Sequence, residues 1–242
     1  TSDLTVQHGY GGIQARGTPQ LAGLSLTAGR DILLGTSVDE GSLFSNGALT
    51  LQAGGDVVVD SNSSIYSDGN LQVTTGGDFT ISQTHGGGML QVQDGDASIT
   101  AAGSITLSTH GTDPALRVYP GGSITLTTDQ LTIPVTALPN TVTTTGVVTI
   151  KPYTAARPVS VGGVSANELS LTDALLDKVT AGGLVLGDST AGELTVMDMI
   201  TRTSATNVTL ASGGDVILGG TINTAGGNLT LIPGTAPAKV KS

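Results

Sequence analysis

The stretch LTLQAGGDVVV, residues 49–59, places two short runs of alternating apolar residues on either side of a Gly-Gly-Asp turn. Alternation with a period of two is typical of a β-strand with one buried face. The same pattern, Φ-x-Φ-x-x-G-x-(D/S)-Φ-x-Φ with Φ mainly apolar, recurs at residues 24–34, 71–81, 97–107, 116–126 and 208–218. The recurrence predicts a repeated structural unit and not a single hairpin.

The eighth position of each copy carries a short side chain that can bond nearby backbone amides: Asp31, Asp56, Asp78, Ser104, Ser123 and Asp215. The sixth position is glycine except at Ala102, and glycine adopts positive φ at little cost. We interpret these residues as structural turn positions. A column of the aspartates would have the same structural origin, since serine replaces aspartate in two copies.

Each repeat holds about three short strands and three turns, and the repeat length stays near 23 residues. An antiparallel sandwich or barrel is the alternative, but it predicts neither a fixed period nor identical turn chemistry. A parallel β-helix, or β-solenoid, explains both, and the length of the chain predicts about ten coils at the ~4.8 Å strand spacing. In this fold Leu49 lies between Leu24 and Leu71 in a buried column.

We expect a single β-solenoid over residues 1–242, with regular coils at 20–130 and 201–234 and irregular, decorated coils at 131–200. Residues 235–242 are expected to form a flexible tail. Thr172 as an N-cap, Asp173 in the first turn and Gly182 beyond the end predict a short helix or loop decoration near 172–181.

The composition argues against several classes of function. The chain has 242 residues with 2% aromatics, no cysteine and a formal net charge of −10. The negative charge opposes nucleic-acid binding, because phosphate backbones are repelled. No apolar run reaches the ~20 residues of a membrane helix, so we expect no membrane insertion.

The sequence contains no recognisable catalytic or metal-binding set. His8, His85 and His110 are far apart, and no stretch matches the nonapeptide calcium repeats or an EF-hand. Most acidic residues are at the repeated turns instead of clustering as a lyase or glycosidase requires. We therefore predict no enzymatic activity, metal or cofactor, and retain a polysaccharide-active β-helix enzyme as an alternative.

The segment 151–168 is the best candidate for a contact surface. It combines Lys151, Tyr153 and Arg157, residue types that are enriched at binding hot spots. The alternative is a proline-containing turn that only covers the rod. Three sequons, at Asn62, Asn207 and Asn228, are candidate glycosylation sites.

The Φ-x-Φ-x-x-G-G-D repeats, together with TGVVTIKPYTAARPVSVGG (145–163) and the segment 169–196, resemble filamentous haemagglutinin-type exoproteins of Gram-negative bacteria. The resemblance covers about residues 20–232. It implies a right-handed parallel β-helix that is secreted to the bacterial cell surface through an outer-membrane two-partner secretion transporter. It also implies an adhesive role, with a receptor or glycan on a host or neighbouring cell as partner.

These observations favour a structural segment of a secreted surface exoprotein that forms a rigid rod for adhesion or display. A filament subunit that self-associates end to end is the first alternative, because open solenoid ends expose unpaired strand edges.

Overall fold

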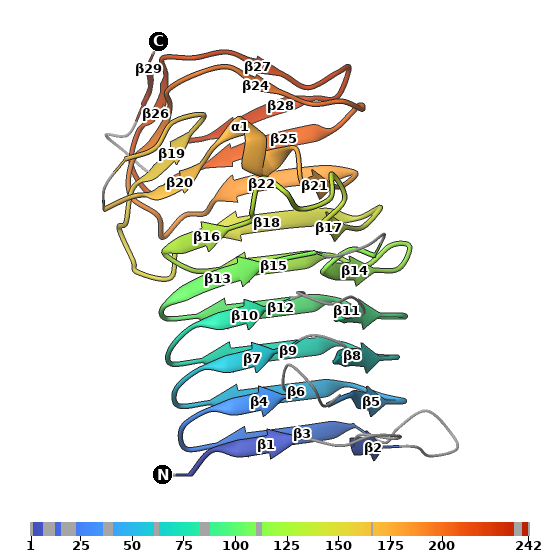
Figure 1. The fold of residues 1–242 in the computed structure, drawn as a ribbon. Coiled ribbons are helices and arrows are strands. Elements are labelled where there is room, and N and C mark those ends of the chain that lie inside the picture. Colours follow the sequence, from blue (N-terminus) through green and yellow to red (C-terminus); the bar gives the residue numbers. More distant parts are fainter. Residues whose placement is uncertain are drawn as a thin grey trace.

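The protein is a β-solenoid in which the chain winds upward from the N-terminus at the bottom of Figure 1 to the C-terminus at the top. The computed structural model describes residues 2–6, 13–15, 23–35, 41–60, 63–82, 88–109, 113–165, 167–234 and 239–241. All strand pairings in this part of the chain are parallel, as stacked coils require. The predicted parallel β-helix is confirmed.

Three sheets form the sides of the lower coils, and each coil adds one strand to each sheet. The first sheet contains β1 (Leu4–Val6), β4 (Ile32–Leu34), β7 (Val57–Val59), β10 (Phe79–Ile81), β13 (Ser104–Leu107) and β16 (Gln130–Thr132). The second contains β2 (Ile13–Ala15), β5 (Leu43–Ser45), β8 (Ser64–Ser67), β11 (Met89–Val92), β14 (Leu116–Val118), β17 (Val142–Thr143) and β21 (Val179–Thr180).

The third sheet runs the whole height of the solenoid and has nine strands. These are β3 (Leu24–Ala28), β6 (Leu49–Ala53), β9 (Leu71–Thr75), β12 (Ala97–Ala101), β15 (Ile124–Thr127), β18 (Val147–Lys151), β22 (Gly183–Gly187), β25 (Asn207–Ala211) and β28 (Leu229–Ile232).

Two smaller sheets complete the upper coils. One has the order β20 (Leu169–Leu171), β19 (Val159–Val161), β23 (Leu194–Val196), β26 (Val216–Leu218) and β29 (Val240–Lys241). The other pairs β24 (Ile200–Thr201) with β27 (Ile222–Asn223). In the upper coils these two sheets take the places that the first and second sheets have in the lower coils.

The core consists of aliphatic columns that follow the strand register. Leu49 pairs with Leu24 on one side and with Leu71 on the other, as predicted. The next inward position stacks Leu51 between Leu26 and Val73. Both Leu49 and Leu51 are completely buried, because the coils above and below place aliphatic side chains at the same register position.

The same register is visible on the outer surface of the second sheet. Phe44 of β5 pairs with Tyr66 of β8, and their rings stack 4.6 Å apart with an interplanar angle of 6°. This distance is close to the spacing of hydrogen-bonded strands. The Tyr66 hydroxyl also donates to Asp68 Oδ1 at 2.7 Å.

The solenoid has about eight turns, not the ten predicted, because nine strands of the long sheet are separated by eight steps. Most turns use about 22 to 27 residues, but the turn from Val148 in β18 to Leu184 in β22 uses 184 − 148 = 36. Eight steps correspond to a rod of ~38 Å along the strand-stacking direction.

The long turn contains β19, β20, α1 (Asp173–Leu176) and β21, which together we call the insertion, although β21 keeps its place in the second sheet. Thr172 caps α1, as predicted, and its Oγ1 accepts a hydrogen bond from the Leu175 amide at 3.2 Å. The helix ends at Leu176 with Asp177 as its C-cap, so Gly182 is not its stop signal. Gly182 instead lies at the next corner, where a Cβ would overlap the carbonyl oxygen of Thr145.

Part of the predicted flexible tail, 235–242, is a strand. Of these residues the structure describes 239–241, and Val240–Lys241 forms β29, which pairs with β26. The Lys239 amide donates to Asp215 Oδ1 at 2.6 Å, and Lys241 Nζ forms an ion pair with the same carboxylate. The side chain of Asp215 therefore fixes this segment. The other predicted boundaries stay predictions.

Within the described ranges, no helix has the length and apolar character needed to cross a bilayer.

Truncation of one core side chain tests the columnar packing. We expect Leu51→Ala to lower the free energy of unfolding by about 2–5 kcal/mol, because the fixed backbone ladder prevents neighbouring coils from filling the cavity. Gln52→Ala, at the adjacent exposed position of β6, is the matched control and should change it by less than about 0.5 kcal/mol. Urea denaturation measures both, and equal effects would contradict the proposed core.

Candidate interaction surface

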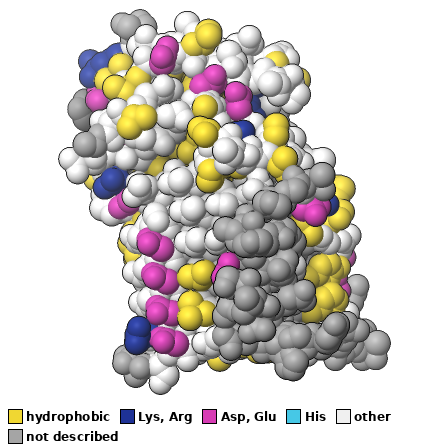
Figure 2. Space-filling view, in the orientation of Figure 1, with side chains coloured by type: hydrophobic (Ala, Val, Ile, Leu, Met, Phe, Trp, Pro, Cys, Tyr) yellow, Lys and Arg dark blue, Asp and Glu magenta, His cyan; other side chains and the backbone are white. Residues whose placement is uncertain are grey.

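Aspartates at the corner after the long sheet form a hydrogen-bonded ladder from coil to coil. Asp31 Oδ1 accepts from the Asp56 amide at 2.8 Å, and Asp56 Oδ1 accepts from the Asp78 amide at 2.8 Å. Asp78 Oδ1 accepts from the Ser104 amide at 2.6 Å and from its hydroxyl at 3.0 Å. Figure 2 shows the resulting column of acidic side chains over the lower coils. Each carboxylate therefore accepts a hydrogen bond from the backbone of the following coil. This bond gives the column of aspartates a structural role.

Ser123 lies at a different corner from the other five predicted turn positions. It precedes β15 and follows β14, so the copy at 116–126 spans the corner before the long sheet. The Ser123 amide bonds Asp96 Oδ1 at 2.7 Å, and the Asp96 amide bonds Asn70 Oδ1 at 3.0 Å. The sequence pattern does not distinguish the two corners, because both contain glycine and short polar residues. Asp215 does lie after the long sheet, between β25 and β26.

The second glycine of the Gly-Gly-Asp turn is required by close packing and not by positive φ. A Cβ on Gly55 would overlap Asp31 Oδ1, and a Cβ on Gly77 would overlap Asp56 Oδ1. Neither glycine has positive φ. The carboxylate that bonds the next coil therefore occupies the space of the missing side chain. In the first of these turns Arg30 replaces this glycine, where the equivalent bond from Asp31 to Asp3 is long, at 3.4 Å.

The predicted contact residues lie at the base of the insertion, and both of their cations are ion-paired. Lys151 Nζ is 3.1 Å from Asp188 Oδ2, and Arg157 Nε is 3.7 Å from Asp129 Oδ1. Tyr153 has 48% of its surface exposed, and its amide donates to Asp129 Oδ1 at 3.0 Å. Asp129 thus brings Tyr153 and Arg157 together, while Lys151 belongs to a separate pair. A contact role for these residues stays a prediction.

The environment of Asp188 lowers the pKa of its carboxyl group below the ordinary value. Burial acts in the opposite direction, but hydrogen bonds from Thr190 and Lys151 outweigh it. Thr190 donates to Asp188 Oδ1 through its hydroxyl at 2.7 Å and its amide at 2.8 Å. The ionised carboxylate therefore holds the turn after β22 to the end of β18.

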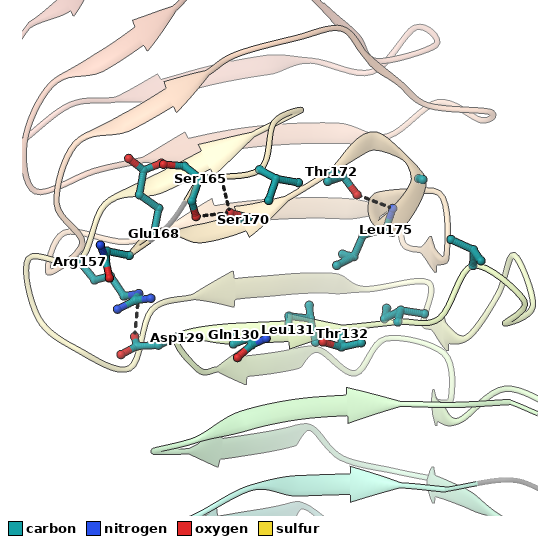
Figure 3. A pocket seen from close by; sticks show the side chains of 15 residues that line it. Asp129, Gln130, Leu131, Thr132, Arg157, Ser165, Glu168, Ser170, Thr172 and Leu175 are labelled. Carbon is teal, nitrogen blue, oxygen red and sulfur yellow. Dashed lines mark hydrogen bonds and ion pairs between the residues drawn. The ribbon is translucent and has the colours of Figure 1, made fainter.

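A groove of about 450 Å³ opens where the insertion leaves the regular stack, between β16 and β20 (Figure 3). Its lining is mixed: apolar Leu131, Ile133, Val135, Val164, Ala174 and Leu175, and polar Asp129, Gln130, Thr132, Arg157, Ser165, Asn167, Glu168, Ser170 and Thr172. The sequence analysis did not predict the groove. The sequence feature that marks its position is the end of the repeat pattern after Leu131, which is followed by Pro134.

Two of the three sequons are on the solenoid surface. Asn207 and Asn228 are exposed, and Asn207 Oδ1 accepts a hydrogen bond from the Asn228 amide at 3.0 Å. Asn62 lies outside the described residues. Their modification stays a prediction.

His8, His85 and His110 also lie outside the described residues. In the part of the chain that the structure describes, no group of three or more His, Asp or Glu side chains is arranged to hold a metal ion. The predicted absence of metal and cofactor remains untested.

No family model, curated protein or solved structure was found to match the chain.

A double-mutant cycle tests the corner ladder. We expect Gly77→Ala alone to lower the free energy of unfolding by about 2 kcal/mol or more, because the new Cβ displaces Asp56 Oδ1 from its bond to the next coil. In an Asp56→Ala background, Gly77→Ala should cost much less, since the obstructing oxygen is absent. Purely additive costs in urea denaturation would contradict the ladder.

Removal of Lys151 should raise the pKa of Asp188. In the native protein this pKa is lowered, so Asp188 stabilises the fold above the unfolded value of ~3.9, and its contribution is lost as the pH falls through the folded value. Lys151→Met should shift that loss to higher pH. Carboxyl titration by NMR measures the effect, with Lys178→Met as the control because Lys178 bonds the Val135 and Ala137 carbonyls instead. An unchanged midpoint in Lys151→Met would disprove the coupling.

Proposed function

We propose that the chain is a rigid rod segment of a secreted bacterial surface exoprotein, used for adhesion or display at the cell surface. The observation that carries this proposal is the nine-stranded parallel sheet, which continues from β3 to β28 through the insertion. Along this sheet the stack has few ways to bend, because each of its strands is hydrogen-bonded to the strands of the neighbouring coils.

The corner side chains add to this rigidity. The Asp31–Asp56–Asp78 ladder connects the lower coils, and Asp215 connects the upper ones to β29. In both places the acceptor lies in one coil and the amide donor in the next. The most prominent repeated polar feature of the sequence thus supports a mechanical role.

The partners belong to the proposal and are supported by the sequence resemblance. The parent chain would cross the outer membrane through a two-partner secretion transporter, and the rod would present a receptor- or glycan-binding element. Tyr153, half exposed beside the Arg157–Asp129 ion pair, lies at the base of the insertion. Because aromatic and arginine side chains are enriched at hot spots, this corner is the favoured contact point.

A polysaccharide-active enzyme is the second candidate, favoured by the presence of Asp129, Glu168 and Arg157 in one groove. Asp129, however, already accepts the amides of Tyr153 and Thr154, at 3.0 and 2.9 Å, in addition to pairing with Arg157. A carboxylate with this many structural bonds is poorly suited to proton transfer. The groove therefore favours binding over catalysis.

End-to-end association is the third candidate. The last coil exposes Leu229, Ile232 and Val240, and the partly buried Leu4 and Leu24 occupy the first coil. Stacking of a second copy would cover these side chains in the same way as an additional coil. Analytical ultracentrifugation over a range of concentrations would detect such stacking as a rise in sedimentation coefficient.

Surface labelling tests the rod proposal. Antibodies raised against the folded chain should label intact cells of the source organism, because a secreted exoprotein is outside the permeability barrier. Antibodies against a cytoplasmic protein are the control and should label only lysed cells. Labelling that requires lysis would disprove the surface location.

Adhesion is tested separately with beads coated with the purified protein. Tyr153→Ala combined with Arg157→Ala should reduce bead attachment to target cells at least threefold, whereas Gln52→Ala, in a strand four steps away along the long sheet, should not. Equal attachment by all three proteins would rule out the predicted contact corner.

A further inference from the structure

Two sheets of the solenoid end facing each other at the insertion. β16 is the last strand of the six-stranded sheet, and β20 is the edge strand of the five-stranded sheet above it. No pairing joins them among the described residues, although some of their Cα atoms lie within 8 Å. Paired strands are ~4.8 Å apart, so the sheet is interrupted here. The groove in Figure 3 occupies this interruption.

The open edge of β16 presents backbone groups that bond the next coil everywhere below it. The Ile32 amide donates to the Asp56 carbonyl at 2.9 Å, and the Val57 amide donates to the Asp78 carbonyl at 2.9 Å. In the strand register, the equivalent residues of the following coils are Phe79, Ile105 and Leu131. The Leu131 amide and carbonyl therefore point toward β20, which does not pair with them.

The lower edge of β20 presents the complementary groups. The Leu169 amide donates to the Pro158 carbonyl at 2.9 Å, and the Leu171 carbonyl accepts from the Gly162 amide at 2.8 Å. Both residues therefore bond the β19 side. Because successive residues of a strand direct their backbone groups to opposite sides, the amide and carbonyl of Ser170 point toward β16.

The side chains around this interruption define what would fit it. Val135 and Val164 line the groove and are 82% and 81% exposed, so their apolar surface is available to an occupant. Asp129 and Glu168 precede β16 and β20 at the same end of the groove, where Arg157 balances one of the two negative charges. Glu168 forms no ion pair within the described part of the chain. A basic group is therefore favoured at this end.

We propose that the groove binds an extended peptide segment of another protein by strand addition between β16 and β20, with a basic residue near Glu168. Its backbone would bond Leu131 on one side and Ser170 on the other, and would join the two sheets into one. β-Strand addition gives affinity through main-chain hydrogen bonds and specificity through alternate side chains. Entry requires β16 and β20 to separate to about twice the strand spacing, ~9.6 Å. This inference does not depend on the rod function.

The probe is a fluorescein-labelled peptide with the sequence of residues 103–109, which includes β13, with lysine in place of its one glycine, Gly103. Fluorescence anisotropy should show saturable binding to the full chain. The control peptide carries N-methyl groups on alternate amides and should bind at least tenfold more weakly, because it cannot complete the ladder. Equal binding of the two peptides, or no binding up to millimolar concentration, would overturn the proposal.

Amide hydrogen exchange, followed by NMR, identifies the site. In the free protein the Leu131 and Ser170 amides should exchange faster than that of Ile105, which has the same ladder position but a paired neighbour. The peptide should slow Leu131 and Ser170 at least tenfold and leave Ile105 unchanged. If Leu131 is already as protected as Ile105, the strands are paired and the proposal is wrong. Displacement of the peptide by a neutral oligosaccharide, without protection of these amides, would assign the groove to glycans instead.

Variants separate backbone recognition from side-chain recognition. Ser170→Pro removes the amide that faces β16 and should abolish peptide binding, whereas Ser170→Ala removes only the hydroxyl and should retain it. Glu168→Gln provides a test that leaves the backbone intact: it should weaken the lysine peptide at least threefold and leave a norleucine analogue unaffected. Circular dichroism checks that each variant is folded. Equal affinity of the lysine peptide for the native chain and Glu168→Gln would contradict the assigned orientation.

Discussion

The structure depends on the backbone ladder between successive coils. Because each strand is hydrogen-bonded to its equivalents above and below, the chain must return to the same point one strand spacing higher on every turn. This requirement places corner on corner, with little space between them. The carboxylate of Asp56 can bond the next coil only because Gly77 has no side chain, and Asp31 and Gly55 repeat the arrangement. The Gly-Gly-Asp motif therefore lets successive corners pack one strand spacing apart and still form a side-chain hydrogen bond between them.

The sequence predicted the parts of the fold that this ladder makes periodic. Leu24, Leu49 and Leu71 form the expected column, and Thr172 caps the expected helix. Local patterns could not separate two corners with the same chemistry, so Ser123 was assigned to the wrong one. The number of coils was overestimated because the insertion uses 36 residues for a single step. The groove also escaped prediction, since it arises from the missing pairing of β16 with β20, which no local motif encodes.

The interruption and the long sheet have different consequences for function. One side of the solenoid is continuous across all nine strands, which supports a mechanical role. On another side the insertion leaves an open groove where two strands would otherwise pair. The facing edges of β16 and β20 retain the backbone amides and carbonyls that such pairing would use. Asp129 lines the groove and also contacts Tyr153 and Arg157 at the corner where the insertion starts. The groove and the continuous sheet lie on different sides of the solenoid.

Distances between spin labels test the in-register stack most directly, and the absence of cysteine allows labels to be introduced at chosen pairs. Ser25, Thr149 and Thr209 share one column on the long sheet, five and seven strand steps apart counted from Ser25. Double electron–electron resonance should give label-to-label distances close to the backbone separations, ~24 Å for Ser25–Thr149 and ~34 Å for Ser25–Thr209. Distances that do not increase with the number of intervening coils would contradict the solenoid.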